Sequence, residues 1–432
     1  MPSRTRFSQI FLLPLALMGA LLFASPQSAR AQFSLIPMDE TQADHLKAYG
    51  VAYWALMAPR NWVVEWVLNY RSGSFIVYSD SEVQRKCILE GVTVHPLSAA
   101  DRDSILREIE TANMELVTLE KAPKVAVYVP PNHEPWDDAV TLALEYSGIP
   151  YAKIWDPDVL SDRILDFDWI HLHHEDFSGQ YGKFYRSFRN APWYRERVRF
   201  YKEAAREAGF ETVAAHKRAV TVHLANYVSE GGFLFAMCSA CDTLDIALAA
   251  ENVDIIMPQI DDTPMTPGAQ EKLRFENCLA FENFTLFPDP FRYEFSDIDC
   301  GPTDGSPPLY RNKWFTLTNF SPKHDPVPSM LNQCHVDEVA EFRGQTSAFR
   351  KNLLKDDVQI LAEFKGEGAV KYLHRNFGEG TLTYFAGHDP EDYEHHVGET
   401  ATELSLHKNS PGYRLILNNI LFPAAKKRQR ET

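Results

Sequence analysis

The residue with the clearest chemical potential is Cys238, which directly follows the apolar run Phe233–Met237. We interpret that run as a buried strand and the residues from Cys241 onward as a helix. Unpaired N–H groups at a helix N-terminus stabilise a thiolate, and a sharp strand-to-helix turn holds the side chain out toward a substrate. If Cys238 is a nucleophile, we therefore expect its thiol pKa to lie below the free value of about 8.5. The next backbone N–H, that of Ser239, can point at a developing oxyanion.

The same cysteine has two other interpretations. Cys238 could be a small buried hydrophobe that ends a core strand. Alternatively, Cys238 and Cys241 could form the CxxC pair of a redox protein at the start of a helix. The remaining cysteines are sparse, and three of them are candidates for a structural disulfide in a loop-rich part of the chain: Cys278, Cys300 and Cys334.

A second group of candidate side chains runs from His171 to Asp176, because imidazoles and carboxylates suit a divalent ion. A strand would place His171 and His173 on one face and His174 on the other, so the three imidazoles would not converge. We therefore favour a pocket residue at His174 or Glu175 over a metal site. We expect no metal and no other cofactor.

Short β-rich segments alternate with helical ones between residues 124 and 260. In chain order, we predict strands at 125–129, 151–155 and 168–175, helices at 136–148 and 214–229, and the strand at 233–237. Such alternation indicates an α/β fold whose parallel sheet is flanked by helices, with the ligand crevice at the carboxyl ends of the strands. We predict that residues 124–175, 214–260 and about 355–425 form one sheet with Cys238 at such an end.

Two stretches carry a family resemblance. AMCSAC, residues 236–241, resembles the Gly-x-Cys-x-Gly nucleophile elbow of the class I glutamine amidotransferase-like fold, with alanines in place of both glycines. FGEGTLTYFAGHDPEDYE (377–394) and SPGYRLILNNILFPAA (410–425) resemble the close of ThuA-like domains, which belong to the same superfamily. The resemblance implies flavodoxin-like layering over about residues 124–425.

The resemblance also implies a catalytic triad in which His388 is the base of the cysteine and Glu391 orients it. The family uses His-x-Glu, whereas this chain has His-Asp-Pro-Glu, so Asp389 is the alternative acid. A group near Gly179 would complete the oxyanion hole with the Ser239 N–H. The pocket would lie among the loops after residues 175, 237 and 387.

These features favour a cysteine-dependent amide hydrolase of the glutaminase kind, with a small-molecule amide as substrate. Hydrolysis is favoured over synthesis because the chain shows no nucleotide-binding motif for a synthase site. The competing class is a ThuA-like, carbohydrate-associated binding or processing protein in which Cys238 is structural. A sugar could stack on four aromatic residues: Tyr181, Phe184, Tyr185 and Trp193.

The segment LIPMDETQADHLKAYGVAYWAL, residues 35–56, resembles exported bacterial proteins catalogued as asparagine synthetase B. An asparagine synthetase would need an N-terminal cysteine nucleophile and a Ser-Gly-Gly-x-Asp-Ser pyrophosphate loop. This chain offers Gln32 at the expected mature start and only Arg-Ser-Gly-Ser at 71–74. The resemblance therefore comes without the synthetase active site.

The first 31 residues have the pattern of a secretory signal peptide: early arginines, an apolar run at about 10–24, and Ala-Arg-Ala at 29–31. We expect cleavage before Gln32 and a periplasmic or secreted product with no membrane association afterwards. Cleavage removes three arginines and takes the formal net charge from −16 to −19, which disfavours nucleic acid as a partner.

We divide the chain into a signal peptide (1–31), an N-terminal accessory α/β region (32–121), an amidotransferase-like domain (122–425, with an insertion at about 260–355) and a basic tail (426–432). A capping box at Ser98 and Asp101 begins a helix that we expect to continue through Leu116 and to close the accessory region. The oligomeric state does not follow from the sequence.

Overall fold

The computed structural model describes residues 32–425 except 79–80, 133–137, 302–308, 395 and 397. The expected signal peptide and basic tail lie outside the described residues. In the part of the chain that is described, no helix combines the length and the apolar character that crossing a membrane requires.

The N-terminal region is built on an antiparallel sheet. Within the described residues its five strands lie in the order β4-β1-β3-β2-β5. Their bounds are β1 (Phe33–Ile36), β2 (Val64–Leu68), β3 (Ser74–Tyr78), β4 (His95–Leu97) and β5 (Glu115–Leu119), and the helices are α1 (His45–Leu56), α2 (Ser81–Glu90) and α3 (Ala99–Thr111).

Helix α3 begins at the predicted capping box but ends earlier than predicted. Leu116 lies in β5, where it pairs with Val67 of β2. The apolar residues keep a helical spacing beyond the end of α3, but this spacing does not determine the structure there. The hydrogen bonds of β5 to β2 make the segment a strand.

The large sheet is mixed. Its ten strands, counted over the described residues, lie in the order β11-β10-β13-β14-β15-β9-β8-β6-β7, with β12 paired to β14. The bounds are β6 (Val125–Tyr128), β7 (Tyr151–Ile154), β8 (Trp169–Leu172), β9 (Phe233–Met237), β10 (Trp314–Leu317), β11 (Glu338–Ala340), β12 (Phe349–Arg350), β13 (Gln359–Phe364), β14 (Ala369–Phe377) and β15 (Gly380–Phe385).

The expectation of a parallel sheet holds for only part of this sheet. β7, β6, β8, β9 and β15 are parallel, as the alternation of strands and helices predicted. From β15 onward the pairing is antiparallel, because only Gly378 and Glu379 join β14 to β15 and so short a connection forces a hairpin. β10 and β11 also join this sheet, although they lie within the segment 260–355 that we interpreted as an insertion.

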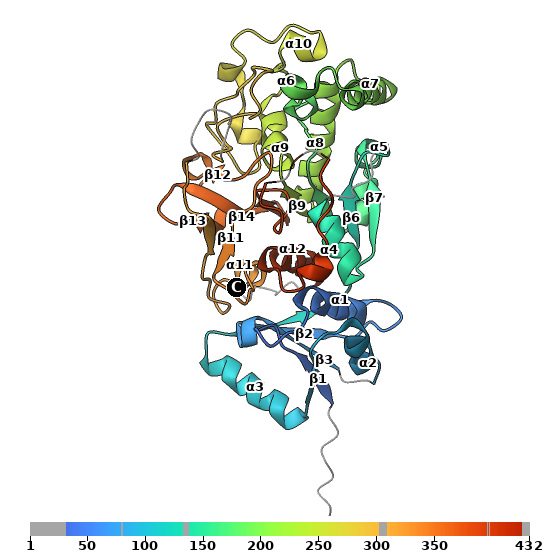
Figure 1. Cartoon of the computed structure of the whole chain (residues 1–432), viewed down its shortest axis with the longest axis vertical. Helices are drawn as coiled ribbons and strands as arrows, with labels where there is room; N and C mark the ends of the chain where they lie inside the picture. Colours follow the sequence, from blue (N-terminus) through green and yellow to red (C-terminus); the bar gives the residue numbers. More distant parts are fainter. Residues whose placement is uncertain are drawn as a thin grey trace, which may run out of the picture.

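Helices cover both faces of the parallel part (Figure 1). Phe235 and Met237 of β9 belong to one hydrophobic core, and the alternating Leu234 and Ala236 belong to the other. The first core includes α4 (Ala139–Ser147) and α12 (Pro411–Leu421), and the second includes α5 (Asp156–Leu160), α8 (Val213–Ser229) and α9 (Ala240–Ala249). The other helices are α6 (Tyr185–Phe188), α7 (Pro192–Glu207), α10 (Pro258–Asp261) and α11 (Pro326–Leu331).

The N-terminal region shares its core with the large domain. Helix α1 is buried along almost its whole length and lies beside α4 and α12 (Figure 1). Tyr49 of α1 donates a hydrogen bond to Asn418, and the fully buried Arg414 donates to Met38 O at 2.7 Å. The region is therefore integral to the packing of the domain that carries Cys238.

Candidate functional site

The candidate site lies where three neighbouring parallel strands end. β8, β9 and β15 end at residues 172, 237 and 385 and are followed by His173, Cys238 and His388. The Cys238 N–H donates to Gly387 O at 3.1 Å, and the Ala240 N–H donates to His173 O at 3.0 Å. These bonds fix the three loops to one another, as the carboxyl-end rule predicted.

Cys238 occupies a strained turn. Its φ is +52°, in the left-handed region that non-glycine residues seldom adopt, and α9 begins two residues later. Ala236 and Ala240, on either side of this turn, are fully buried, as expected of small residues where a helix packs on a strand. The geometry matches the sharp strand-to-helix turn expected from the sequence.

The sulfur of Cys238 is buried, with 4% of the residue exposed. Burial raises the pKa of its thiol to about 11, even though backbone N–H groups of Gln345, Ser239 and Thr346 hydrogen-bond the sulfur and oppose this shift. The Gln345 N–H lies 3.3 Å from Sγ. The expected lowering of this pKa was therefore wrong for the resting structure, because loss of hydration outweighs three N–H donors.

A loop that sequence reasoning missed covers the sulfur; we call residues 342–347 the covering loop. The Gln345 side chain donates to Gly182 O at 2.7 Å, and the His388 N–H donates to Arg343 O at 2.9 Å. The buried Lys371 ammonium anchors both ends of the loop by donating hydrogen bonds to Phe342 O and to Ser347 O. No local sequence pattern marks this loop as a neighbour of Cys238, because Gln345 lies 107 residues further along the chain.

Three histidines converge at the same strand ends. His173 Nε2 lies 2.8 Å from His388 Nδ1, and the rings of His174 and His388 stack with centroids 5.8 Å apart. The prediction that His174 lies on the face opposite His173 was wrong: their rings are 5.1 Å apart, because β8 ends at Leu172 and strand alternation does not reach residues 173 and 174.

Asp138 supports these histidines. It caps the N-terminus of α4, where its Oδ1 accepts from the N–H groups of Val140 and Thr141 at 2.8 and 3.0 Å. Its Oδ2 lies 3.1 Å from His171 Nε2 and 3.7 Å from His173 Nδ1. Burial would raise the pKa of Asp138, but the two imidazoles outweigh it and hold this pKa well below its usual range. An N-cap could be predicted from the sequence, but the contact with the histidines could not.

The two acids expected to orient His388 are engaged with other groups. Glu391 Oε2 lies 2.8 Å from His407 Nδ1. Asp389 Oδ1 accepts from the Glu391 N–H at 2.9 Å, and burial raises the pKa of Asp389. Among the described residues, Asp138 is a carboxylate near this pair of imidazoles: its Oδ2 lies 3.7 Å from His173 Nδ1, and His173 Nε2 lies 2.8 Å from His388 Nδ1.

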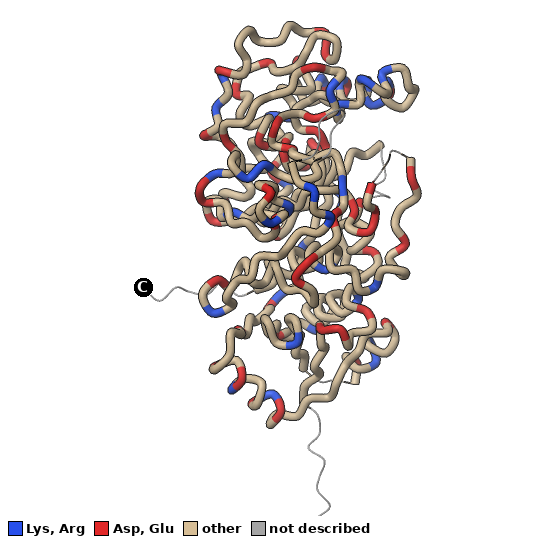
Figure 2. The backbone as a smooth tube through the Cα atoms, turned by 60° about the vertical axis from the view of Figure 1, so that its left-hand side comes forward, with Lys and Arg blue, Asp and Glu red and all other residues tan. Residues whose placement is uncertain are grey.

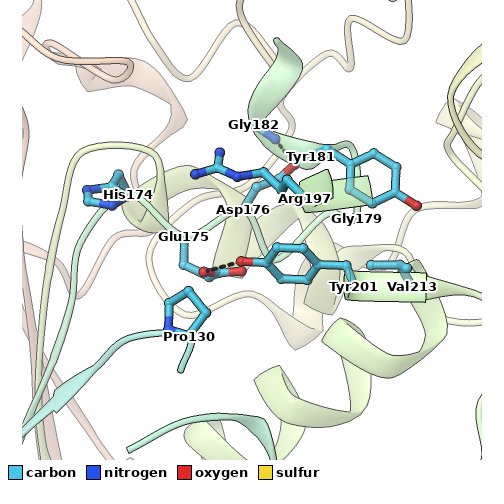
Figure 3. A pocket seen from close by; sticks show the side chains of 10 residues that line it. All are labelled: Pro130, His174, Glu175, Asp176, Gly179, Tyr181, Gly182, Arg197, Tyr201 and Val213. Carbon is cyan, nitrogen blue, oxygen red and sulfur yellow. Dashed lines mark hydrogen bonds between the residues drawn. The ribbon is translucent and has the colours of Figure 1, made fainter. Parts of the chain in front are cut away.

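Glu175, Gly179 and His174 line a small pocket beside this site, together with Pro130, Asp176, Tyr181, Gly182, Arg197, Tyr201 and Val213 (Figure 3). Glu175 accepts from the Tyr201 hydroxyl at 3.0 Å and pairs with the buried Lys217 ammonium at 3.0 Å. Gly179 packs so closely on Ala214 that a Cβ would lie 2.8 Å from its Cα. Gly179 lines this pocket and Cys238 does not, so the structure does not bring the expected oxyanion group near Gly179 together with the sulfur.

The four aromatic residues considered for sugar stacking each pack against another aromatic ring of the protein. The rings of Phe184 and Trp193 are 5.7 Å apart, and Tyr181 is buried against Tyr194 at 6.4 Å. Tyr185 lies edge-on to Phe291 at 5.8 Å.

All six cysteines lie in described parts of the chain and are free. The expectation of a bridge among Cys278, Cys300 and Cys334 is not met in this structure. Cys241 is fully buried, its thiol faces Ala236 O at 3.3 Å, and burial raises its pKa well above the usual value. Cys241 is thus more enclosed than Cys238.

Comparison with known proteins finds only distant structural likenesses. No family model matches the sequence, and no curated protein matches it either. The chain is similar to cytoplasmic protein STM3548 from Salmonella typhimurium (10% identity, 70% of this chain and 100% of that one, TM-score 0.34) and to STM1381 from the same species (13% identity, the same shares and TM-score). A β-galactosidase from Bacillus circulans sp. alkalophilus matches over 63% of this chain and 30% of its own, at 11% identity and a TM-score of 0.24. Likenesses at these scores carry no argument about function.

Proposed function

We propose that the protein is a cysteine-dependent hydrolase that cleaves a small-molecule amide at Cys238. The observation that supports this most is the φ of +52° between β9 and α9. Strained backbone of this kind persists only where the surroundings impose it, and it clusters at active sites. A cysteine that only fills core volume needs no left-handed backbone.

The chain of contacts from Asp138 through His173 to His388 supplies a base of defined tautomer. We assign the proton of His173 to Nδ1, which faces Asp138 Oδ2 at 3.7 Å, and this assignment leaves Nε2 as an acceptor. His388 then donates from Nδ1 across the 2.8 Å contact, which places the lone pair of His388 on Nε2. This arrangement gives His388 the form that accepts a thiol proton.

In the proposed reaction, Cys238 Sγ attacks the amide carbonyl carbon as its proton moves to His388. The C–N bond breaks while His388 returns that proton to the leaving amine. Water then cleaves the thioester with His388 as base again, and the thiol is restored. The N–H groups of Ser239, Gln345 and Thr346, which bond the resting sulfur, are the donors nearest the developing oxyanion.

The covering loop must move for this chemistry, because Cys238 is only 4% exposed and its sulfur cannot contact the carbonyl carbon of a substrate. Movement would also hydrate the sulfur and so remove the burial that raises its pKa to about 11. Substrate access and thiolate formation are therefore coupled to the same motion.

A second candidate function keeps Cys238 structural, in a carbohydrate-associated binding or processing protein. The observation that favours it is the burial of the thiol with a raised pKa, which is typical of an inert core cysteine. In that case equal sugar binding is expected for the native protein and for Cys238→Ser, with no amide hydrolysis in either.

Ammonia release from a panel of small amides, including glutamine and asparagine, tests the hydrolase proposal. Cys238→Ser should abolish the activity, and His388→Gln should lower it by about 10²–10⁴-fold, as loss of a general base does. The matched control is Cys241→Ser, three residues away, which should keep the activity. Hydrolysis that persists in Cys238→Ser would contradict the proposal.

A further inference from the structure

We propose that His173, His174 and His388 form a binding site for one divalent transition-metal ion of the zinc class. The sequence led us to expect no metal here, because strand alternation was expected to separate His174 from His171 and His173. The inference does not rest on the proposed hydrolase activity.

The geometry of the three imidazoles fits an ion between them. One ring nitrogen from each lies within 4.8 Å of the other two, and His173 Nε2 and His388 Nδ1 are 2.8 Å apart. Zinc–nitrogen bonds of about 2.0–2.1 Å in a tetrahedral site separate two ligand atoms by about 3.3 Å. To bind zinc, the nitrogens of His173 and His388 therefore have to move apart by about half an ångström, and the ring nitrogen of His174 has to move closer to them.

A carboxylate behind one ligand is an independent feature of a built metal site. Ligating histidines commonly give their second N–H to a carboxylate, which fixes the tautomer and strengthens the donor nitrogen. Asp138 Oδ2 lies 3.7 Å from His173 Nδ1, and the N-terminus of α4 anchors its other oxygen. A hydrogen bond from His173 to Asp138 needs an approach of about 0.5 Å, to roughly 3.2 Å, and His173 Nε2 already faces His388 Nδ1.

The donor set selects the class of ion. Three imidazoles suit zinc, copper or nickel rather than magnesium or calcium, which prefer oxygen ligands. Three protein ligands also leave a fourth position for water or a substrate atom.

Metal binding would compete with the thiol chemistry. An ion on His388 Nδ1 takes up the lone pair and leaves the proton on Nε2, so the ring can no longer accept a proton from Cys238. This one consequence rests on the proposed function: a bound ion would keep the hydrolase inactive.

Calorimetric titration of tag-free, chelator-treated protein with Zn²⁺ tests the proposal. We expect one ion per chain and at least about 100-fold weaker binding in His173→Gln and in His174→Gln, since even outer partners of a ligand are worth 10–100-fold. The control is His223→Gln. The His223 ring contacts Asp162 at 2.7 Å and is not part of the histidine cluster, so this variant should bind Zn²⁺ as the native protein does.

Co²⁺ titration gives a second readout, because its visible absorption reports nitrogen ligation in a tetrahedral site. His174 is only half-buried, so His174→Gln should fold, and a melting curve confirms this for each variant. No binding by the native protein, or unchanged Zn²⁺ affinity in both His173→Gln and His174→Gln, would overturn the metal site. Neither readout involves amide hydrolysis, so a failure of the hydrolase proposal would leave the zinc result standing.

Discussion

At the scale of single residues, Cys238 shows what local sequence can and cannot predict. The strand, the turn and the following helix are encoded within about 15 residues, and all three lie where they were predicted. The burial of the sulfur is not encoded there, because Gln345 comes from a distant loop. The pKa of the thiol was consequently predicted in the wrong direction.

The histidines give the same lesson. The pattern His-Leu-His-His could be recognised, but the end of β8 at Leu172 could not be fixed to within a residue, and that residue decides where His174 points. The pairing with His388 spans more than 200 residues of sequence and becomes visible only in the fold.

Asp299 yields a prediction on pH dependence. Its Oδ1 accepts from the N–H groups of Gly301 and Ser347 at 2.9 and 3.2 Å, and burial outweighs these bonds and raises its pKa to about 7. The folded protein therefore keeps a proton that the unfolded chain releases near pH 4. The resulting stabilisation is complete below that pH and is lost as pH rises toward 7.

Asp299→Asn should remove this dependence while keeping an oxygen for both N–H groups. Between pH 5 and 7, the free energy of unfolding of the native protein should fall by about 2 kcal/mol more than that of the variant. Urea unfolding at several pH values measures the difference. Parallel stability profiles for the two proteins would refute the assignment.

At the scale of elements, the βαβ part was predictable and the antiparallel extension was not. Strands β6 to β9 and helix α8 show strong local patterns. β10 and β11 are short and lie in a Pro-rich and Gly-rich stretch; β10 pairs with β13, and β11 pairs with β10. Their membership of the sheet is a tertiary effect without a local signature.

Gly387 is the point where β15 meets the covering loop, and it supplies a prediction about that contact. Its φ is +96°, and a Cβ would lie 2.5 Å from the Phe342 ring. Gly387→Ala should therefore cost about 1–2 kcal/mol for the left-handed backbone and a further 1–3 kcal/mol for the overlap. Gly366→Ala is the control, because Gly366 also has positive φ, +73°, but open space around it, so only the first penalty applies. Equal losses of unfolding free energy in the two variants would contradict the close packing of the covering loop.

At the scale of the whole molecule, the region 32–121 is tied to the large domain by a common core. Chain length led us to predict an accessory region here, and the buried contacts of α1 with α4 and α12 could not be predicted from it. Acidic and basic residues are interspersed along the chain (Figure 2). The site at the ends of β8, β9 and β15 therefore lies in a domain whose packing depends on most of the described chain.

The measurement that tests the central claim most directly is the rate of iodoacetamide labelling at Cys238 and Cys241 in the folded protein, resolved by mass spectrometry. Both thiols are buried in the resting structure, so only a cysteine that a functional motion exposes should react. The account predicts that Cys238 is labelled well before Cys241 and faster as pH rises, and that Cys238→Ser leaves the melting temperature nearly unchanged. Labelling of Cys238 as slow as that of Cys241, together with a clear loss of stability in Cys238→Ser, would show that the cysteine is structural and would contradict the account.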